Sequence, residues 1–130
     1  MKKFSFYLYL IYFTIFILGC DDQLTIPSDD ELPMHNISYS KHIQPIFNVR
    51  CATVGCHDDE TKSGNLSLTS WHKTTADYTI VFPGNPDQSR LVLSIEGRSV
   101  YLMPPVGRPP LTQAQIRAIR TWVAEGAKNN

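Results

Sequence analysis

Two cysteines and a histidine are the residues in this sequence whose types and spacing best suit a chemical role. Cys51 and Cys56 are separated by Ala-Thr-Val-Gly, and His57 directly follows the second cysteine. Two thiols in this order can form thioethers with the two vinyl groups of haem, and the adjacent imidazole then lies under the ring as an iron ligand. Gly55 helps the intervening segment to turn, because glycine tolerates unusual backbone dihedrals. The pattern therefore predicts one covalently bound haem c.

Two other chemistries are open to the same three residues. In an oxidising compartment, Cys51 and Cys56 would close a small disulfide loop and leave His57 at the surface. Alternatively, the two thiolates and the imidazole would bind zinc together with a fourth ligand. Neither accounts for the amphipathic stretch before Cys51 together with the proline-rich methionine segment that follows later, so haem is the favoured interpretation.

Met103 is a candidate for a second ligand of the iron. It lies in Leu-Met-Pro-Pro, and four prolines occur within the seven residues that follow it. A lone methionine usually fills core space, but a loop stiffened by proline suits a weak thioether ligand. The alternative second ligands are three histidines, His35, His42 and His72. An iron with two histidine ligands would have a lower reduction potential than one with histidine and methionine.

A helix over residues 40–50 is predicted to lead into the first cysteine. Its apolar residues Ile43, Ile46 and Phe47 have the spacing of one helical face. Pro45 lacks an amide donor, so the helix either begins near it or kinks there.

Two further helices are predicted later in the chain. One begins at Asn85-Pro86-Asp87-Gln88, an Asn cap with proline at the first helical position, runs to about residue 95 and stops at Gly97. Its inward-facing residues are expected to be Leu91, Val92 and Ile95. The other begins with Thr112 and Gln115 as a capping box. Its buried stripe is expected to contain Ile116, Ile119 and Val123, with Trp122 beside it.

The remaining segments are expected to be loops. Residues 58–70 and 99–111 are rich in Gly, Pro, Ser and Asn. The acidic cluster at residues 58–60 is interpreted as a solvated part of the first loop, and residues 78–82 offer the best match to a strand. A helical domain with long loops is readily explained if a flat apolar cofactor lies between them.

From about Tyr39 to Ala127 the chain resembles the single-haem class I c-type cytochromes. The segments that carry the resemblance are KHIQPIFNVRCATVGCH, FPGNPDQSRLVLSI, YLMPP and LTQAQIRAIRTWVAEGA. The resemblance implies a mainly α, small cytochrome c-like fold, with helices and long loops packed around one haem. It also implies His57 and Met103 as iron ligands, and first and last helices that cross with Phe47 beside Trp122. The chain departs from the family in having four residues between the cysteines instead of the usual two.

The N-terminal residues indicate export and lipid anchoring. Residues 1–19 contain two lysines, an apolar run and no acid, as in a signal peptide, and the run is shorter than the roughly 20 residues of a membrane-spanning helix. It ends in Ile-Leu-Gly-Cys, which resembles the lipobox of bacterial lipoproteins and identifies Cys20 as the expected lipidation site. Residues 20–35 contain five acids and no base and are expected to form a flexible tether. Residues 36–130 are the expected cytochrome c-like domain.

Charge and size limit the class of function. From Met34 onward, ten basic and seven acidic residues give a net charge of +3, which is too small to argue for nucleic-acid binding. About 95 residues form a small core, to which a cofactor often contributes buried surface. The net charge of +3 favours docking to an acidic redox partner.

The expected function is single-electron transfer at the bacterial envelope, on the periplasmic or cell-surface side. Envelope redox proteins would be the electron donor and acceptor, the lipid anchor would hold the protein at the membrane, and six-coordinate iron would act on no small-molecule substrate. The main alternative is a structural or accessory haem-binding module of an envelope complex. An enzyme such as a small peroxidase is disfavoured, because no distal histidine and arginine pair has a recognisable spacing.

Overall fold

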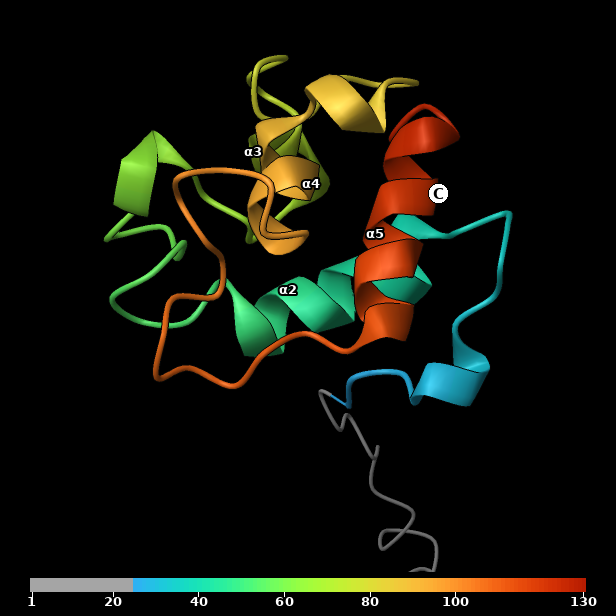
Figure 1. Cartoon of the computed structure of the whole chain (residues 1–130), viewed down its shortest axis with the longest axis horizontal. Coiled ribbons are helices and arrows are strands. Elements are labelled where there is room, and N and C mark those ends of the chain that lie inside the picture. Colours follow the sequence, from blue (N-terminus) through green and yellow to red (C-terminus); the bar gives the residue numbers. More distant parts are fainter. Residues whose placement is uncertain (1–24) are drawn as a thin grey trace, which may run out of the picture.

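The computed structural model describes residues 25–130 as helices joined by long loops, without a β-strand in that range (Figure 1). The α-helices are α2 (Gln44–Arg50), α3 (Trp71–Thr74), α4 (Arg90–Ile95) and α5 (Gln113–Ala124). Shorter helical turns are η1 (Asp29–Glu31), η2 (Tyr39–Ile43), η3 (Ser63–Asn65) and η4 (Pro86–Gln88). Residues 78–82, the best strand candidate, form turns and irregular backbone instead. None of the helices in this range is long and apolar enough to cross a membrane.

The predicted first helix is present as η2 followed directly by α2. Wide π-type turns form η2, and α-helical geometry starts at Gln44, with Pro45 at the second position of α2. Helical turns thus start before the proline, and the helix changes from π-type to α-type geometry next to it. Ile43, Ile46 and Phe47 have no exposed surface, which confirms the predicted inward face.

The predicted second helix is shorter than expected, and its predicted cap is wrong. The side chain of Asn85 caps nothing, and extended backbone at Ser89 (φ −85°, ψ 114°) separates η4 from α4. The buried Ser89 hydroxyl accepts a hydrogen bond from the Phe82 amide (2.8 Å) and donates one to the Asn85 carbonyl (3.0 Å), which fixes this break. Gly97, with φ 72°, follows the helix as predicted. The three expected inward-facing residues are buried: Leu91, Val92 and Ile95.

The capping box predicted for the last helix is confirmed. The Thr112 hydroxyl accepts from the Gln115 amide, and the Gln115 side chain accepts from the Thr112 amide, both at 3.1 Å. Ile119, Trp122 and Val123 are fully buried, as expected. Ile116 is only partly buried. The small residues Ala114 and Ala118 lie in the core instead.

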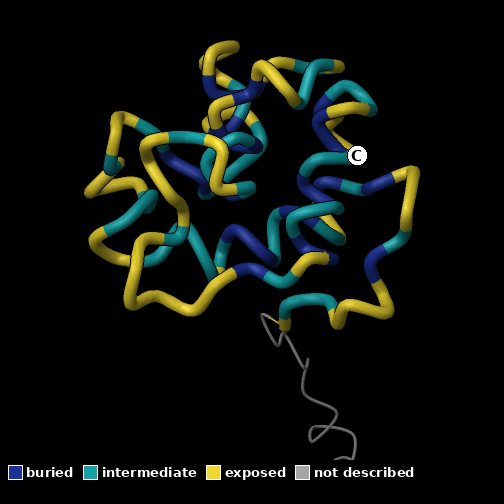
Figure 2. Tube along the Cα trace, viewed as in Figure 1, coloured by how far each residue is buried: buried dark blue, intermediate teal, exposed yellow. Residues whose placement is uncertain are grey.

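Tyr39 joins the first and last helices. Its ring centroid lies 6.4 Å from that of Phe47, edge-on, and 5.2 Å from that of Trp122. The hydroxyl of Tyr39 also forms a buried 3.0 Å hydrogen bond with Thr74 of α3. The expected neighbours Phe47 and Trp122 are thus connected by the Tyr39 ring, which contacts both. The last helix, α5, packs on η2 at the start of the first helix. Figure 2 shows that buried residues lie along these helices and that exposed residues predominate along the long loops.

Packed structure begins before the predicted domain boundary at residue 36. Leu32 is 4% exposed and belongs to the core, and Ile26 packs against it. The Thr112 hydroxyl donates a 2.7 Å hydrogen bond to Asp29, which ties the acidic segment to the start of α5. The predicted signal peptide and Cys20 lie outside the described residues.

Replacement of Thr112 by alanine is expected to lower the free energy of unfolding by about 1 kcal/mol, because the Gln115 amide loses its cap. The measurement is urea denaturation followed by circular dichroism. Gln113→Ala is the matched control, since Gln113 is exposed in the same helical turn and outside the capping box. An equal loss in both variants would contradict the role of the cap.

Candidate functional site

The end of α2 positions the first cysteine. Cys51 is the C-cap of the helix, and its amide donates to the carbonyl of Phe47 at 2.9 Å. Because Phe47 is fully buried, the backbone at Cys51 is held against the core. The buried face of the helix therefore determines where the first thiol lies.

The four residues between the cysteines fold back on themselves. The Cys56 amide donates to the Thr53 carbonyl at 2.9 Å, and the His57 amide donates to the Cys51 carbonyl at 3.1 Å. Gly55 has φ 83°, so glycine is required there for an unstrained turn, and Val54 is 90% exposed. The longer linker thus bulges into solvent while its two ends stay together.

His57 is oriented by the backbone of the loop that follows it. Its Nδ1 lies 3.2 Å from the carbonyl oxygen of Leu66, and its own carbonyl accepts from the Leu68 amide at 2.9 Å. A carbonyl only accepts hydrogen bonds, so Nδ1 carries the proton in this contact and Nε2 of the neutral ring carries a free lone pair. Metal-binding histidines are commonly oriented by such a bond.

Burial raises the pKa of the Cys51 thiol to about 12. The nearby Cys56 thiol adds to this effect, whereas the charge of Arg50 opposes it by lowering the pKa. Cys51 is therefore a protonated thiol at neutral pH. Both thiols are free, so the disulfide alternative is not formed in this structure. Within residues 25–130 no three His, Cys, Asp or Glu side chains gather as a metal site, so the zinc alternative gains no support.

Met103 lies on a different loop from the cysteines. Figure 1 shows residues 99–111 running from the end of α4 to the start of α5. The Met103 amide donates to the Ser94 carbonyl of α4 at 3.1 Å, and the residue is 36% exposed. Cys51, Cys56 and His57 thus lie in one loop, closed by the bond from the His57 amide to the Cys51 carbonyl, whereas Met103 lies in another loop and is held through α4.

Exposed apolar side chains on the same loop fit an apolar ligand. Val100 and Val106 are 90% and 98% exposed, and Tyr101 and Leu102 are also exposed. Clustered exposed apolar residues commonly mark a binding surface.

The alternative histidines have other surroundings. Nδ1 of His42 accepts a hydrogen bond from the Ser38 amide at 2.9 Å at the start of η2. The His72 ring packs edge-on against Trp71 at 5.0 Å and is exposed, as is His35. None of the three lies on the loop that carries Met103.

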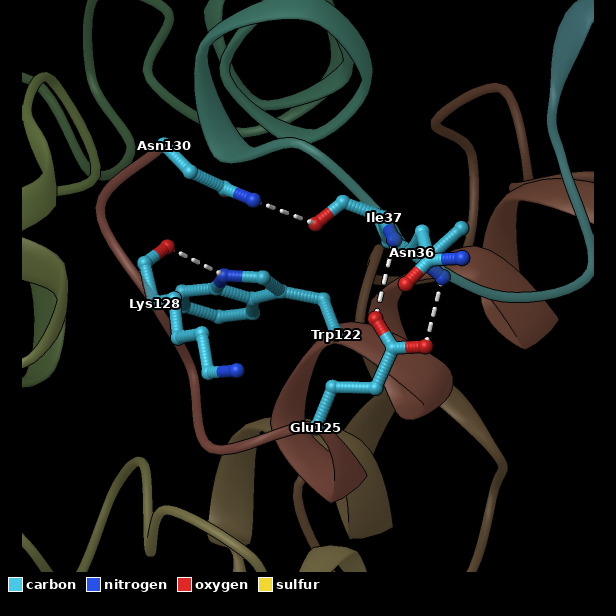
Figure 3. A pocket seen from close by; sticks show the side chains of 6 residues that line it. All are labelled: Asn36, Ile37, Trp122, Glu125, Lys128 and Asn130. Atoms are coloured by element: carbon cyan, nitrogen blue, oxygen red, sulfur yellow. Dashed lines mark hydrogen bonds between the residues drawn. The ribbon is translucent and has the colours of Figure 1, made fainter.

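A cavity of about 220 Å³ at the C-terminal end of α5 contains none of the expected ligands (Figure 3). The Glu125 carboxylate accepts from the amides of Asn36 (2.6 Å) and Ile37 (2.8 Å). The Trp122 indole donates to the Lys128 carbonyl at 2.9 Å. These hydrogen bonds connect the N-terminal segment of the domain to its C-terminal end. The cavity therefore lies between the two ends of the domain, away from the cysteine loop.

A sequence model of a family described as planctomycete cytochrome C matches residues 54–107. The match supports a cytochrome c-like domain. It spans Cys56, His57 and Met103 and begins after Cys51. The helices and long loops of residues 25–130 are consistent with this cytochrome c-like fold, and cytochrome domains bind haem. No curated protein and no solved structure matches the chain.

Two groups that orient this segment are not predictable from the motif. One is the Leu66 carbonyl, which no sequence pattern marks, because the backbone is the same at every residue. The other is Asp58, for which the sequence predicts only a place in a solvated acidic cluster. Its carboxylate accepts hydrogen bonds from the amides of Gly55, Glu60 and Thr61. The only sequence signal for it is the residue type, since Asp often accepts from the amide two residues later in an Asx turn.

In the haem-free protein at pH 8, Cys51 is expected to react with iodoacetamide at least about tenfold more slowly than in urea. The thiolate is the nucleophile, and burial keeps this thiol protonated far above its ordinary pKa. Peptide mapping by mass spectrometry assigns the label to each cysteine. Equal rates at Cys51 in native and urea-denatured protein would contradict the buried thiol.

Proposed function

We propose that the domain binds one haem c covalently through Cys51 and Cys56. His57 Nε2 and the Met103 sulfur would hold the iron. The observation that supports this most strongly is the bond from His57 Nδ1 to the Leu66 carbonyl, next to two free thiols in a cytochrome c-like domain. An imidazole fixed in this tautomer presents the lone pair that an iron ligand requires.

The proposed activity is transfer of single electrons. When bound, haem supplies an iron that cycles between Fe(III) and Fe(II). His57 and Met103 would both bind the iron and leave it no open position for a small-molecule substrate. We therefore propose an electron carrier and not an enzyme. The thioether of Met103 favours Fe(II) relative to a second imidazole and gives a more positive reduction potential.

The proposed location is a bacterial membrane, to which a lipid anchors the protein on the periplasmic or cell-surface side. The support is the sequence alone: a signal peptide pattern that ends in a lipobox-like Ile-Leu-Gly-Cys at Cys20. Because Ile26 packs against the core, only the short stretch from Cys20 to Ile26 would separate the lipid from the domain, about 20 Å when fully extended. The proposed donor and acceptor are therefore envelope redox proteins at the same membrane surface.

The test of haem attachment is a denaturing gel stained for haem, with protein matured in a c-type maturation host. We expect the wild type to retain haem, Cys51→Ala and Cys56→Ala to retain less, and the double variant to retain none. Cys20→Ala is the control, because it removes the proposed lipid site and leaves both haem thiols in place. A wild type without covalent haem in two such hosts would overturn the proposal.

Replacement of Met103 by histidine is expected to lower the reduction potential by at least about 100 mV, within the roughly 800 mV range that axial ligands set. A spectroscopic redox titration measures the potential and gives a one-electron slope. Val106→His is the control, since Val106 lies on the same loop and is 98% exposed. An equal shift in both variants, or none in Met103→His, would exclude Met103 as a ligand.

A further inference from the structure

The carboxylate of Asp58 connects the cysteine linker to the loop that follows His57. One oxygen, Oδ2, accepts from the Gly55 amide at 3.1 Å. The other, Oδ1, accepts from the amides of Glu60 (2.9 Å) and Thr61 (2.8 Å). A single side chain therefore holds the outer end of the linker to the turn after the histidine.

The linker has little else to fix its outer end. Val54 is 90% exposed, so no apolar packing holds it. The bonds from Cys56 to Thr53 and from His57 to Cys51 close turns that enclose Gly55, but the Gly55 amide takes part in neither bond. The Thr61 hydroxyl accepts from the same Gly55 amide at 3.2 Å, and it belongs to the turn that Asp58 caps. The conformation at Gly55 thus depends on that turn.

The neighbouring acid has a different set of contacts. Asp59 pairs with Lys73 at 2.7 Å and accepts from the hydroxyls of Ser67 (2.7 Å) and Thr69 (2.8 Å). Ser67 and Thr69 lie beyond the linker, in the loop that leads to α3, and Lys73 lies in α3 itself. The two adjacent carboxylates therefore stabilise different segments, and only Asp58 contacts the linker in the described structure.

We propose that Asp58 is a positioning residue for haem attachment, which holds the four-residue linker so that both Cys51 and Cys56 reach their vinyl groups. The inference rests on the proposed function and names the residue that makes the long linker compatible with it. In each attachment the thiol adds across one vinyl double bond, with sulfur bonded to one carbon and hydrogen to the other. The addition needs no oxidant and releases no leaving group.

The physical reason is the fixed separation of the two vinyl groups on a rigid porphyrin. A linker of four residues has more conformations than one of two, and only some place both sulfurs at that separation. The Gly55 bond selects among them before the second thioether forms. Without it, one thiol reacts and the other is left free in part of the molecules.

The test compares thioether content in full-length protein matured with a c-type maturation system. The variants are Asp58→Ala, Asp58→Asn and the matched control Asp59→Ala. The pyridine haemochrome band position reports one or two thioethers, and mass spectrometry of the haem peptide counts free thiols. Hydrogen exchange at the Gly55 amide reports the bond itself.

We expect two thioethers in the wild type and in Asp59→Ala. We expect at least half of the Asp58→Ala molecules to carry one thioether and a free cysteine, with faster exchange at Gly55. Asn retains an acceptor oxygen, so Asp58→Asn is expected to restore most of the double attachment. If Asp58→Ala does not accumulate, Asp58→Ser decides, since its shorter hydroxyl can cap Thr61 without reaching Gly55, and we expect single attachment.

The outcomes that overturn the inference differ from those that overturn the proposed function. Two thioethers in the Asp58 variants as in the wild type would refute the positioning role and leave haem binding intact. A wild type with one thioether would also refute it. A wild type without covalent haem would refute the proposed function and the inference together.

Discussion

The burial of one face of the first helix is the constraint on which the rest of the structure depends. A helix of seven residues is not stable by itself in water, so α2 exists because Ile46 and Phe47 are buried. Tyr39, just before it, contacts both Phe47 and Trp122 of α5. Since Cys51 ends the same helix, the packing that stabilises α2 also fixes the first thiol and buries it.

The loops divide the proposed ligands into two differently held sets. Cys56 and His57 lie in a loop closed by several backbone hydrogen bonds, and the ring of His57 is oriented by the Leu66 carbonyl. Met103 lies in a loop whose apolar side chains face solvent, and its amide is tied to Ser94 of α4. The position of the His57 ring is thus determined by hydrogen bonds within the protein. The methionine side has apolar surface that a bound haem would cover, which for a domain of this size adds to a small core.

Sequence reasoning succeeded where the determining contacts are local. The capping box of Thr112 and Gln115 requires residues three apart, and Pro45 acts through its own missing amide, so both were predictable. The predicted cap at Asn85 was wrong. The Ser89 hydroxyl bonds to the Phe82 amide and to the Asn85 carbonyl and breaks the helix there, and only the folded chain brings Phe82 near Ser89. The mainly α fold was predictable from such local signals and from the family resemblance.

The candidate site divides in the same way. The types and order of Cys51, Cys56 and His57 were visible in the sequence, whereas the groups that orient them were not. The Leu66 carbonyl is reached only after a nine-residue loop returns, and the role of Asp58 depends on a positive φ at Gly55. A motif therefore specifies which atoms react, and the loops around it specify their geometry. In this chain the cysteine linker is longer, and its geometry depends in part on the carboxylate of Asp58, which lies just after His57.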